Sequence, residues 1–137
     1  VQASDSLAKI SAPIMAFRKV LLPGFPSDRI IYGDFFELED SYDLIIEQTF
    51  FCALHPSQRH AYAIKTNELL KVGGKLVGLL FNDSLNNDRP PFGGFKEDYI
   101  KIFRPYFELT VIEESYNSIP PRQGRELFIN LRKIESH

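Results

Sequence analysis

The feature that most constrains the fold is the order of the apolar patterns along the chain. Helix-type and strand-type patterns alternate through most of it, but the last two strand-type segments, 107–114 and 127–134, have no helical pattern between them. Alternation of the two periods is typical of a sheet covered by helices. Successive strands without an intervening helix pair as an antiparallel hairpin. The sequence therefore predicts an α/β domain whose mostly parallel sheet is finished by an antiparallel hairpin.

The elements can be placed approximately from their periodicity and their breaking residues. Residues 75–81 form the clearest strand, because they follow Gly73-Gly74 and are apolar almost throughout. Further strands are expected at 29–32, 42–46 and the two hairpin segments, and residues 1–4 read as the end of another. Helices are expected from Ser11, as a cap, to Pro23-Gly24, from Pro56 to about Val72, and after Gly94, with inward-facing Tyr62, Thr66, Leu69, Tyr99, Ile102 and Phe103.

Composition limits the class of protein. The chain has 137 residues, a formal net charge of −2, one cysteine and three histidines. This length suits a single domain, and the balanced charge disfavours a nucleic-acid partner. A lone cysteine fits a reducing compartment, and the histidines lack the spacing of metal ligands. We expect a cytoplasmic protein with no signal peptide, no membrane partner and no metal, as a monomer or weak homodimer.

Four ordered stretches carry a resemblance to a known family. They are Gly33-Asp34-Phe35-Phe36-Glu37-Leu38, residues 42–54 with Pro56 and Arg59, residues 68–76 with the Gly-Gly step, and Pro90-Pro91-Phe92 together with residues 118–126. In this order they resemble the thiopurine and thiol/halide methyltransferases. The resemblance covers roughly three quarters of the chain.

The resemblance implies a Rossmann-like class I methyltransferase sheet of seven strands, with the last strand antiparallel. It also implies S-adenosyl-L-methionine as cofactor and a small thiol, thiopurine-like or halide acceptor. The family's first strand and its glycine-rich turn have no counterpart in this sequence. We therefore expect residues 1–137 to be a single but amino-terminally incomplete domain, lacking that strand unless another segment fills its place. The alternative is a non-catalytic binding or interaction module that has lost cofactor binding.

The resemblance further assigns candidate cofactor-binding residues. Asp5, at a strand end, would accept hydrogen bonds from the ribose hydroxyls, and Asp34 would accept one from the adenine amino group, with Phe35 against the adenine ring. The alternatives are a capping or loop aspartate for Asp5, a turn aspartate for Asp34 and a core position for Phe35. Glu47, Thr49 and Phe50 follow the strand at 42–46, where ligands of open α/β sheets bind, or they belong to a helix-capping segment.

Three residues are candidates for the acceptor side. Gln48 would face both the sulfonium and the acceptor, and Phe92, in the long loop 82–94, would place an aromatic ring beside the methyl path. We expect these two to be the catalytic residues, through alignment and exclusion of water, since thiols and halides need little general-base help. Arg122 would attract an anionic acceptor. The alternatives are an anchoring phenylalanine in an exposed loop and a surface-paired arginine.

Overall fold

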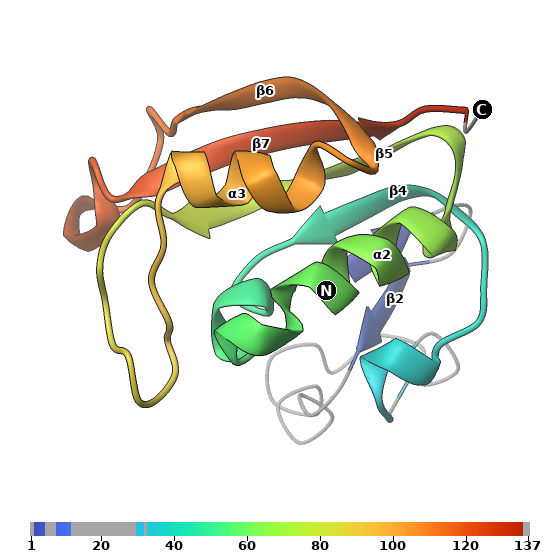
Figure 1. The fold of residues 1–137 in the computed structure, drawn as a ribbon, viewed down its shortest axis with the longest axis horizontal. Coiled ribbons are helices and arrows are strands. Elements are labelled where there is room, and N and C mark those ends of the chain that lie inside the picture. The colour runs from blue at the N-terminus through green and yellow to red at the C-terminus, as the bar shows by residue number, and fades with distance from the viewer. Residues whose placement is uncertain (1, 5–7, 12–29, 32, 136–137) are drawn as a thin grey trace.

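The chain folds as an α/β layer around one mixed sheet (Figure 1). The computed structural model describes residues 2–4, 8–11, 30–31 and 33–135. Asp5 and the helix expected over 12–22 lie outside these residues. Within them, no helix is both long enough and apolar enough to cross a bilayer.

The sheet has seven strands in the order β3-β2-β1-β4-β5-β7-β6. Their bounds are β1 Gln2–Ser4, β2 Ala8–Ser11, β3 Ile30–Ile31, β4 Tyr42–Glu47, β5 Leu70–Phe81, β6 Phe107–Glu114 and β7 Glu126–Lys133. The helices are α2 Arg59–Leu69 and α3 Lys96–Phe103. Short 3-10 helices are η2 Phe35–Glu37, η3 Phe51–Ala53, η4 Pro56–Gln58 and η5 Pro120–Arg122.

The pairing confirms the predicted fold class and its closing hairpin. Strand β7 pairs antiparallel with both β5 and β6, while β4 and β5 are parallel, as are β2 and β3. Strand β1 lies inside the sheet, between β2 and β4, and runs antiparallel to both of them. A segment does therefore fill the position expected to be empty. The sheet contains less parallel pairing than the sequence predicted, because β1 runs against its neighbours.

One local expectation was wrong in its boundary, and another lies outside the described residues. Ser11 ends strand β2 and pairs with Ile31, and the helix that it was expected to cap would begin outside the part of the chain that the structure describes. Helix α2 ends at Leu69 instead of Val72, and Leu70 already pairs with Tyr42 of β4. That ladder gives the backbone around Leu70 hydrogen-bond partners in the sheet, which overrides the local helical pattern.

Both helices cover the same face of the sheet (Figure 1). Aromatic side chains fill the space between, and Phe51 lies at their centre, with its ring centroid 5.0 Å from that of Tyr62, 5.7 Å from Tyr99 and 5.9 Å from Phe103. All four are buried. Burying a side chain of this size stabilises a fold by about 1.5–3 kcal/mol, so this aromatic core anchors the helices to the sheet.

The opposite face of the sheet is lined by alternate residues of the same strands. Because side chains alternate across a strand, Ile45 and Leu76 point to the helices and are buried, whereas Ile46 and Val77 point the other way and are partly exposed. Phe128 of β7 also lies on this face and is 38% exposed. No helix among the described residues covers this side, and we call it the open face.

Candidate functional site

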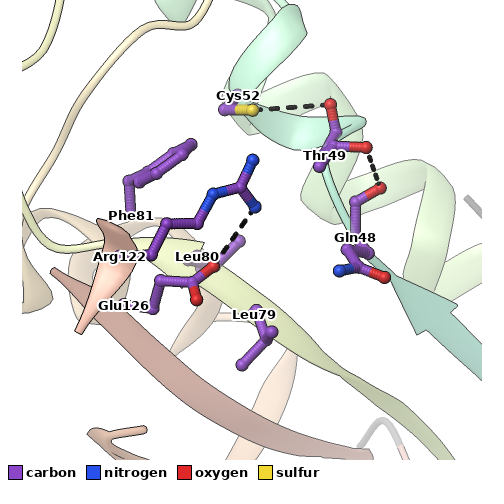
Figure 2. A pocket seen from close by; sticks show the side chains of 8 residues that line it. All are labelled: Gln48, Thr49, Cys52, Leu79, Leu80, Phe81, Arg122 and Glu126. Atoms are coloured by element: carbon purple, nitrogen blue, oxygen red, sulfur yellow. Dashed lines mark hydrogen bonds and ion pairs between the residues drawn. The ribbon is translucent and has the colours of Figure 1, made fainter. Parts of the chain in front are cut away.

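The candidate site is built around the turn that follows β4. Thr49 has a φ of 64°, in the left-handed region that non-glycine residues rarely adopt, and it reverses the chain into η3. Its hydroxyl donates to the Gln48 carbonyl at 2.6 Å, and its own carbonyl accepts from the Cys52 thiol at 3.4 Å (Figure 2). The turn therefore projects Gln48 and Thr49 beyond the carboxyl end of a strand, where ligands of open α/β sheets bind.

Glu47 lies underneath this turn and is almost fully buried, at 1% exposure. One carboxylate oxygen, Oε2, accepts from the Phe50 backbone N–H at 3.0 Å, and Oε1 accepts from the Tyr62 hydroxyl at 2.5 Å. Burial, reinforced by the neighbouring Glu47 carboxylate, raises the pKa of Tyr62 well above its ordinary value. Both carboxylate oxygens of Glu47 thus have partners inside the protein.

Strand β5 approaches this end of β4 closely at Gly78. A Cβ atom at Gly78 would lie 2.1 Å from the Glu47 carbonyl oxygen and 2.8 Å from its Cβ. Only glycine fits there, and its small size brings the two strands together beneath the turn.

A cavity on the open face, which we call the open-face cavity, has a volume of about 390 Å³. Its floor is apolar and belongs to β4, β5 and β7, while polar groups stand at its rim. The lining residues are Leu44, Ile46, Glu47, Gln48, Val77, Gly78, Leu79, Asn117 and Phe128. An apolar cavity with a few polar groups at one edge is the usual form of a small-molecule site.

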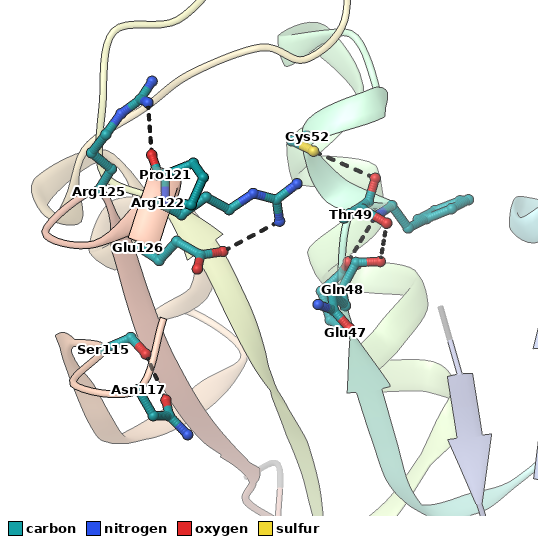
Figure 3. A network of polar contacts seen from close by, with 11 residues as sticks. Glu47, Gln48, Thr49, Cys52, Ser115, Asn117, Pro121, Arg122, Arg125 and Glu126 are labelled. Carbon is teal, nitrogen blue, oxygen red and sulfur yellow. Dashed lines mark hydrogen bonds and ion pairs between the residues drawn. The ribbon is translucent and has the colours of Figure 1, made fainter. Parts of the chain in front are cut away.

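A second, much smaller cavity lies on the other side of Gln48, and we call it the Arg122 pocket. It measures about 10 Å³, and Gln48 and Leu79 line both cavities. The Arg122 guanidinium points from η5 toward the turn (Figure 3). It lies 3.6 Å from the Glu126 carboxylate and 5.3 Å from the Phe81 ring centroid. Arg122 thus lines a pocket with Gln48 and is also paired with Glu126, so its role toward an acceptor stays a prediction.

Cys52 also lines the Arg122 pocket. Desolvation by burial raises the pKa of its thiol, the Glu47 carboxylate raises it further, and Arg122 and Arg59 act in the opposite direction. A thiol with a raised pKa is a poor nucleophile at neutral pH.

The loop after β3 lies beside the turn after β4. Asp34 caps η2 by accepting from the Phe36 N–H at 2.9 Å, and the Phe35 ring packs 5.1 Å from the Phe50 ring and 5.7 Å from that of Tyr62. The two loops therefore meet through these rings, while neither cavity at Gln48 is lined by Asp34 or Phe35. The Phe35 ring is buried within the aromatic core in this structure, so its assignment to the adenine ring stays a prediction, as does that of Asp34.

Phe92 lies elsewhere. Its N–H donates to the Cys52 carbonyl at 2.8 Å, and its ring, 5% exposed, packs 5.5 Å from that of His55. It lines a third cavity of about 240 Å³ behind η3, and neither cavity at Gln48 includes it. Arg59 fixes this arrangement by donating to the Gly93 carbonyl at 2.6 Å. The structure matches the anchoring alternative for this ring, and a catalytic role for Phe92 stays a prediction.

Several residues of the site were not singled out by sequence reasoning. Tyr62 was expected only as a core residue, and Glu126 and Asn117 were not expected to face the site. The signal for Glu126 was available, because a glutamate four residues after Arg122 opens an apolar strand. Nothing local in the sequence indicates that Tyr62 reaches Glu47, fifteen residues away along the chain.

Comparison with known proteins gives both a family and a fold. Residues 12–135 match the family described as thiopurine S-methyltransferase. Two relatives from Arabidopsis thaliana are a probable thiol methyltransferase 2, 36% identical over 77% of this chain and 48% of its own length, and thiocyanate methyltransferase 1, 33% identical over 68% of this chain and 41% of its own. The chain thus spans about half the length of the curated relatives that it matches.

Solved structures share the fold at lower identity. One is the N-methyltransferase NodS from Bradyrhizobium japonicum in complex with S-adenosyl-L-homocysteine, with a TM-score of 0.67 and 16% identity over 93% of this chain and 66% of the other. Another is a TehB-like S-adenosylmethionine-dependent methyltransferase from Corynebacterium glutamicum, with a TM-score of 0.64 and 21% identity over 91% and 66% of the two chains. These likenesses show that the sheet has the class I methyltransferase fold.

Proposed function

This chain belongs to the thiopurine S-methyltransferase family, and from that premise we propose that it serves methyl transfer from S-adenosylmethionine to a small thiol, thiopurine-like or halide acceptor. The family is one of S-adenosylmethionine-dependent methyltransferases. The observation that carries the proposal is the place of the Gln48–Thr49 turn. It stands at a strand's carboxyl end, between an apolar cavity and a pocket containing an arginine.

The open-face cavity is chemically suited to part of such a cofactor. Leu44, Ile46 and Val77 offer apolar surface to carbon-rich groups, and the Gln48 amide stands at the edge. Glu47 lies under the turn and holds its backbone by accepting from the Phe50 N–H. When bound, S-adenosylmethionine supplies a methyl group that the positive sulfur already activates. Gln48 and Thr49 would orient the reacting groups, and Leu79 would exclude water from them.

Arg122 supports an acceptor that is anionic. Its guanidinium lies at the mouth of the small pocket, where it would stabilise a thiolate over the neutral thiol or attract a halide. Glu126 holds it there and balances its charge. The names of the two Arabidopsis relatives, which refer to thiol and thiocyanate, support the same class of acceptor.

One observation favours a second candidate, a non-catalytic binding module. Strand β1 runs antiparallel to both of its neighbours, β2 and β4. Its amino end, Gln2, therefore pairs with Ile46 near the carboxyl end of β4, where open sheets of parallel strands bind their ligands. Such a module would keep the fold and the open-face cavity without catalysing transfer.

Calorimetric titration of the complete gene product with S-adenosylhomocysteine, followed by a methyl-transfer assay against a panel of thiols and halides with labelled cofactor, tests these two candidates. Asp34→Asn should weaken binding, whereas Asp43→Asn, an exposed aspartate beside Lys71 at the other end of β4, should not. A folded protein that does not bind the cofactor supports the module. Failure of the intact protein to bind the cofactor rejects the enzyme.

A further inference from the structure

We propose that Glu47 and Tyr62 form a brace that positions the Gln48–Phe50 turn, so that Glu47 acts on the site through the backbone of this turn instead of as a direct ligand of the cofactor. Tyr62 is thus a positioning residue. The functional part of this proposal rests on the proposed methyltransferase function, whereas the structural part, the geometry of the turn, can be tested without that function.

The first support is the use of the Glu47 carboxylate. Oε2 accepts a hydrogen bond from the Phe50 N–H at 3.0 Å, and Oε1 accepts one from the Tyr62 hydroxyl at 2.5 Å. The side chain is almost fully buried, so the carboxylate is held inside the protein. A buried carboxylate needs such partners, because it has lost those that water would offer. Glu47 is therefore linked to the turn on one side and to helix α2 on the other.

The second support is the conformation that the brace holds. Thr49 adopts a left-handed backbone without the freedom of glycine, and such residues persist only where their surroundings enforce the conformation. The bond from the Phe50 N–H to Glu47 closes the turn over this residue. The orientations of Gln48 and Thr49 at the two cavities thus depend on the bond.

The third support is the rigidity of the other end. Tyr62 has no exposed surface, and its ring packs 5.0 Å from that of Phe51 and 5.7 Å from that of Phe35. Gly78 leaves no free space on the strand side of Glu47. The Tyr62 hydroxyl is therefore a fixed point from which the carboxylate, and through it the turn, takes its position.

The chain offers a close control. Tyr42 is also fully buried and also donates to a carboxylate, Asp40 Oδ2, at 2.9 Å, but it stands at the opposite end of β4. Tyr62→Phe and Tyr42→Phe each remove one tyrosine–carboxylate hydrogen bond from the same strand. Only the first should disturb the turn.

Amide hydrogen exchange tests the structural part. Loss of a hydrogen bond of this kind should speed exchange at Phe50 about tenfold in Tyr62→Phe, with wild-type rates there in Tyr42→Phe. Unchanged exchange at Phe50 in Tyr62→Phe, or an equal rise in both variants, would overturn the brace. This readout needs no ligand, so it decides the matter even if the protein binds no cofactor.

Paired ligand titrations test the functional part, using S-adenosylmethionine and S-adenosylhomocysteine, which lacks the sulfonium charge. If Glu47 acts through the turn, Tyr62→Phe and Glu47→Gln should each lower the affinity for both ligands by a similar factor, about tenfold. If Glu47 instead contacts the sulfonium as a charge, Glu47→Gln should weaken S-adenosylmethionine alone and Tyr62→Phe should change little, which would overturn the proposal. Absence of binding by the wild type would reject the proposed function and leave the exchange result to judge the brace.

Discussion

The two faces of the sheet are built from the same strands but for different tasks. On the covered face, Phe51, Tyr62 and Phe103 interlock beneath α2 and α3, with almost no exposed surface. On the open face, Ile46 and Phe128 are each more than a third exposed, and both border the open-face cavity. Neighbouring residues of one strand therefore contribute separately, one to stability and the next to binding.

The largest expected contrast lies in truncations of equal size on the two faces. Phe103→Ala should lower the free energy of unfolding by about 3–5 kcal/mol, because it leaves a void among packed rings. Phe128→Ala should cost about 1 kcal/mol or less, since its ring is partly in water, while weakening ligand binding in the open-face cavity. Urea unfolding followed by circular dichroism measures both. Equal losses would break the distinction between the faces.

A methyl group placed where the strands meet should have the next largest effect. Gly78→Ala would force its Cβ against the Glu47 backbone and should destabilise the fold by about 1–3 kcal/mol. Gly33→Ala is the control, because no atom lies within 4 Å of its added Cβ. Thermal unfolding of the two variants compares them. A neutral Gly78→Ala would mean that β4 and β5 can separate without loss.

Alkaline pH should act on the covered face. Desolvation by burial raises the pKa of Tyr99 to about 12 and that of Tyr62 well above 10. Between pH 10 and 12 the unfolded chain loses these protons while the folded chain keeps them. The contribution of the two tyrosines to the free energy of unfolding should therefore be constant below pH 10 and fall as the pH rises. Urea titrations at several pH values measure this slope. Tyr99→Phe should reduce it, and an unchanged slope would contradict the assignment.

The smallest effect on stability is expected at the Arg122 pocket. Glu126→Gln removes the carboxylate that neutralises Arg122, so affinity for a halide or thiolate should rise about three- to fivefold with little change in unfolding. Glu108→Gln is the control. It removes the carboxylate paired with Arg132, at the other end of β7, and should leave anion affinity unchanged. Anion titration by calorimetry compares the variants. Lower affinity after Glu126→Gln would mean that the pair positions Arg122 more than it neutralises it.

Sequence reasoning succeeded where the hydrophobic periodicity and the residues that end helices and strands indicate the same element. Strand 75–81 and the hairpin of β6 and β7 were predicted, because an apolar run after two glycines and strict alternation have few other solutions. Prediction failed where pairing decides the structure. The helical pattern of residues 70–72 yields to the ladder with β4, and residues 8–11 form a strand that no local pattern indicated.

The site was predicted in part for a related reason. A strand's end can be recognised locally, and so the Gln48–Phe50 turn was found, as was the arrival of Arg122 beside it. Which oxygen a buried carboxylate offers to which donor depends on contacts between distant elements. Glu47 was therefore placed in the site without its partner Tyr62, and Phe92 was assigned to the methyl path without knowledge of the contact between Arg59 and Gly93 beside it.

Gln48 and Leu79 form a shared wall between the open-face cavity and the Arg122 pocket. A substitution at either residue changes the shape of both spaces at once, so variants selected there for a new acceptor would also alter what the neighbouring cavity accepts. Of these two spaces, Cys52 borders only the Arg122 pocket and Asn117 only the open-face cavity. An engineer who wishes to retune one specificity while conserving the other should begin a library at those two positions and leave the wall for last.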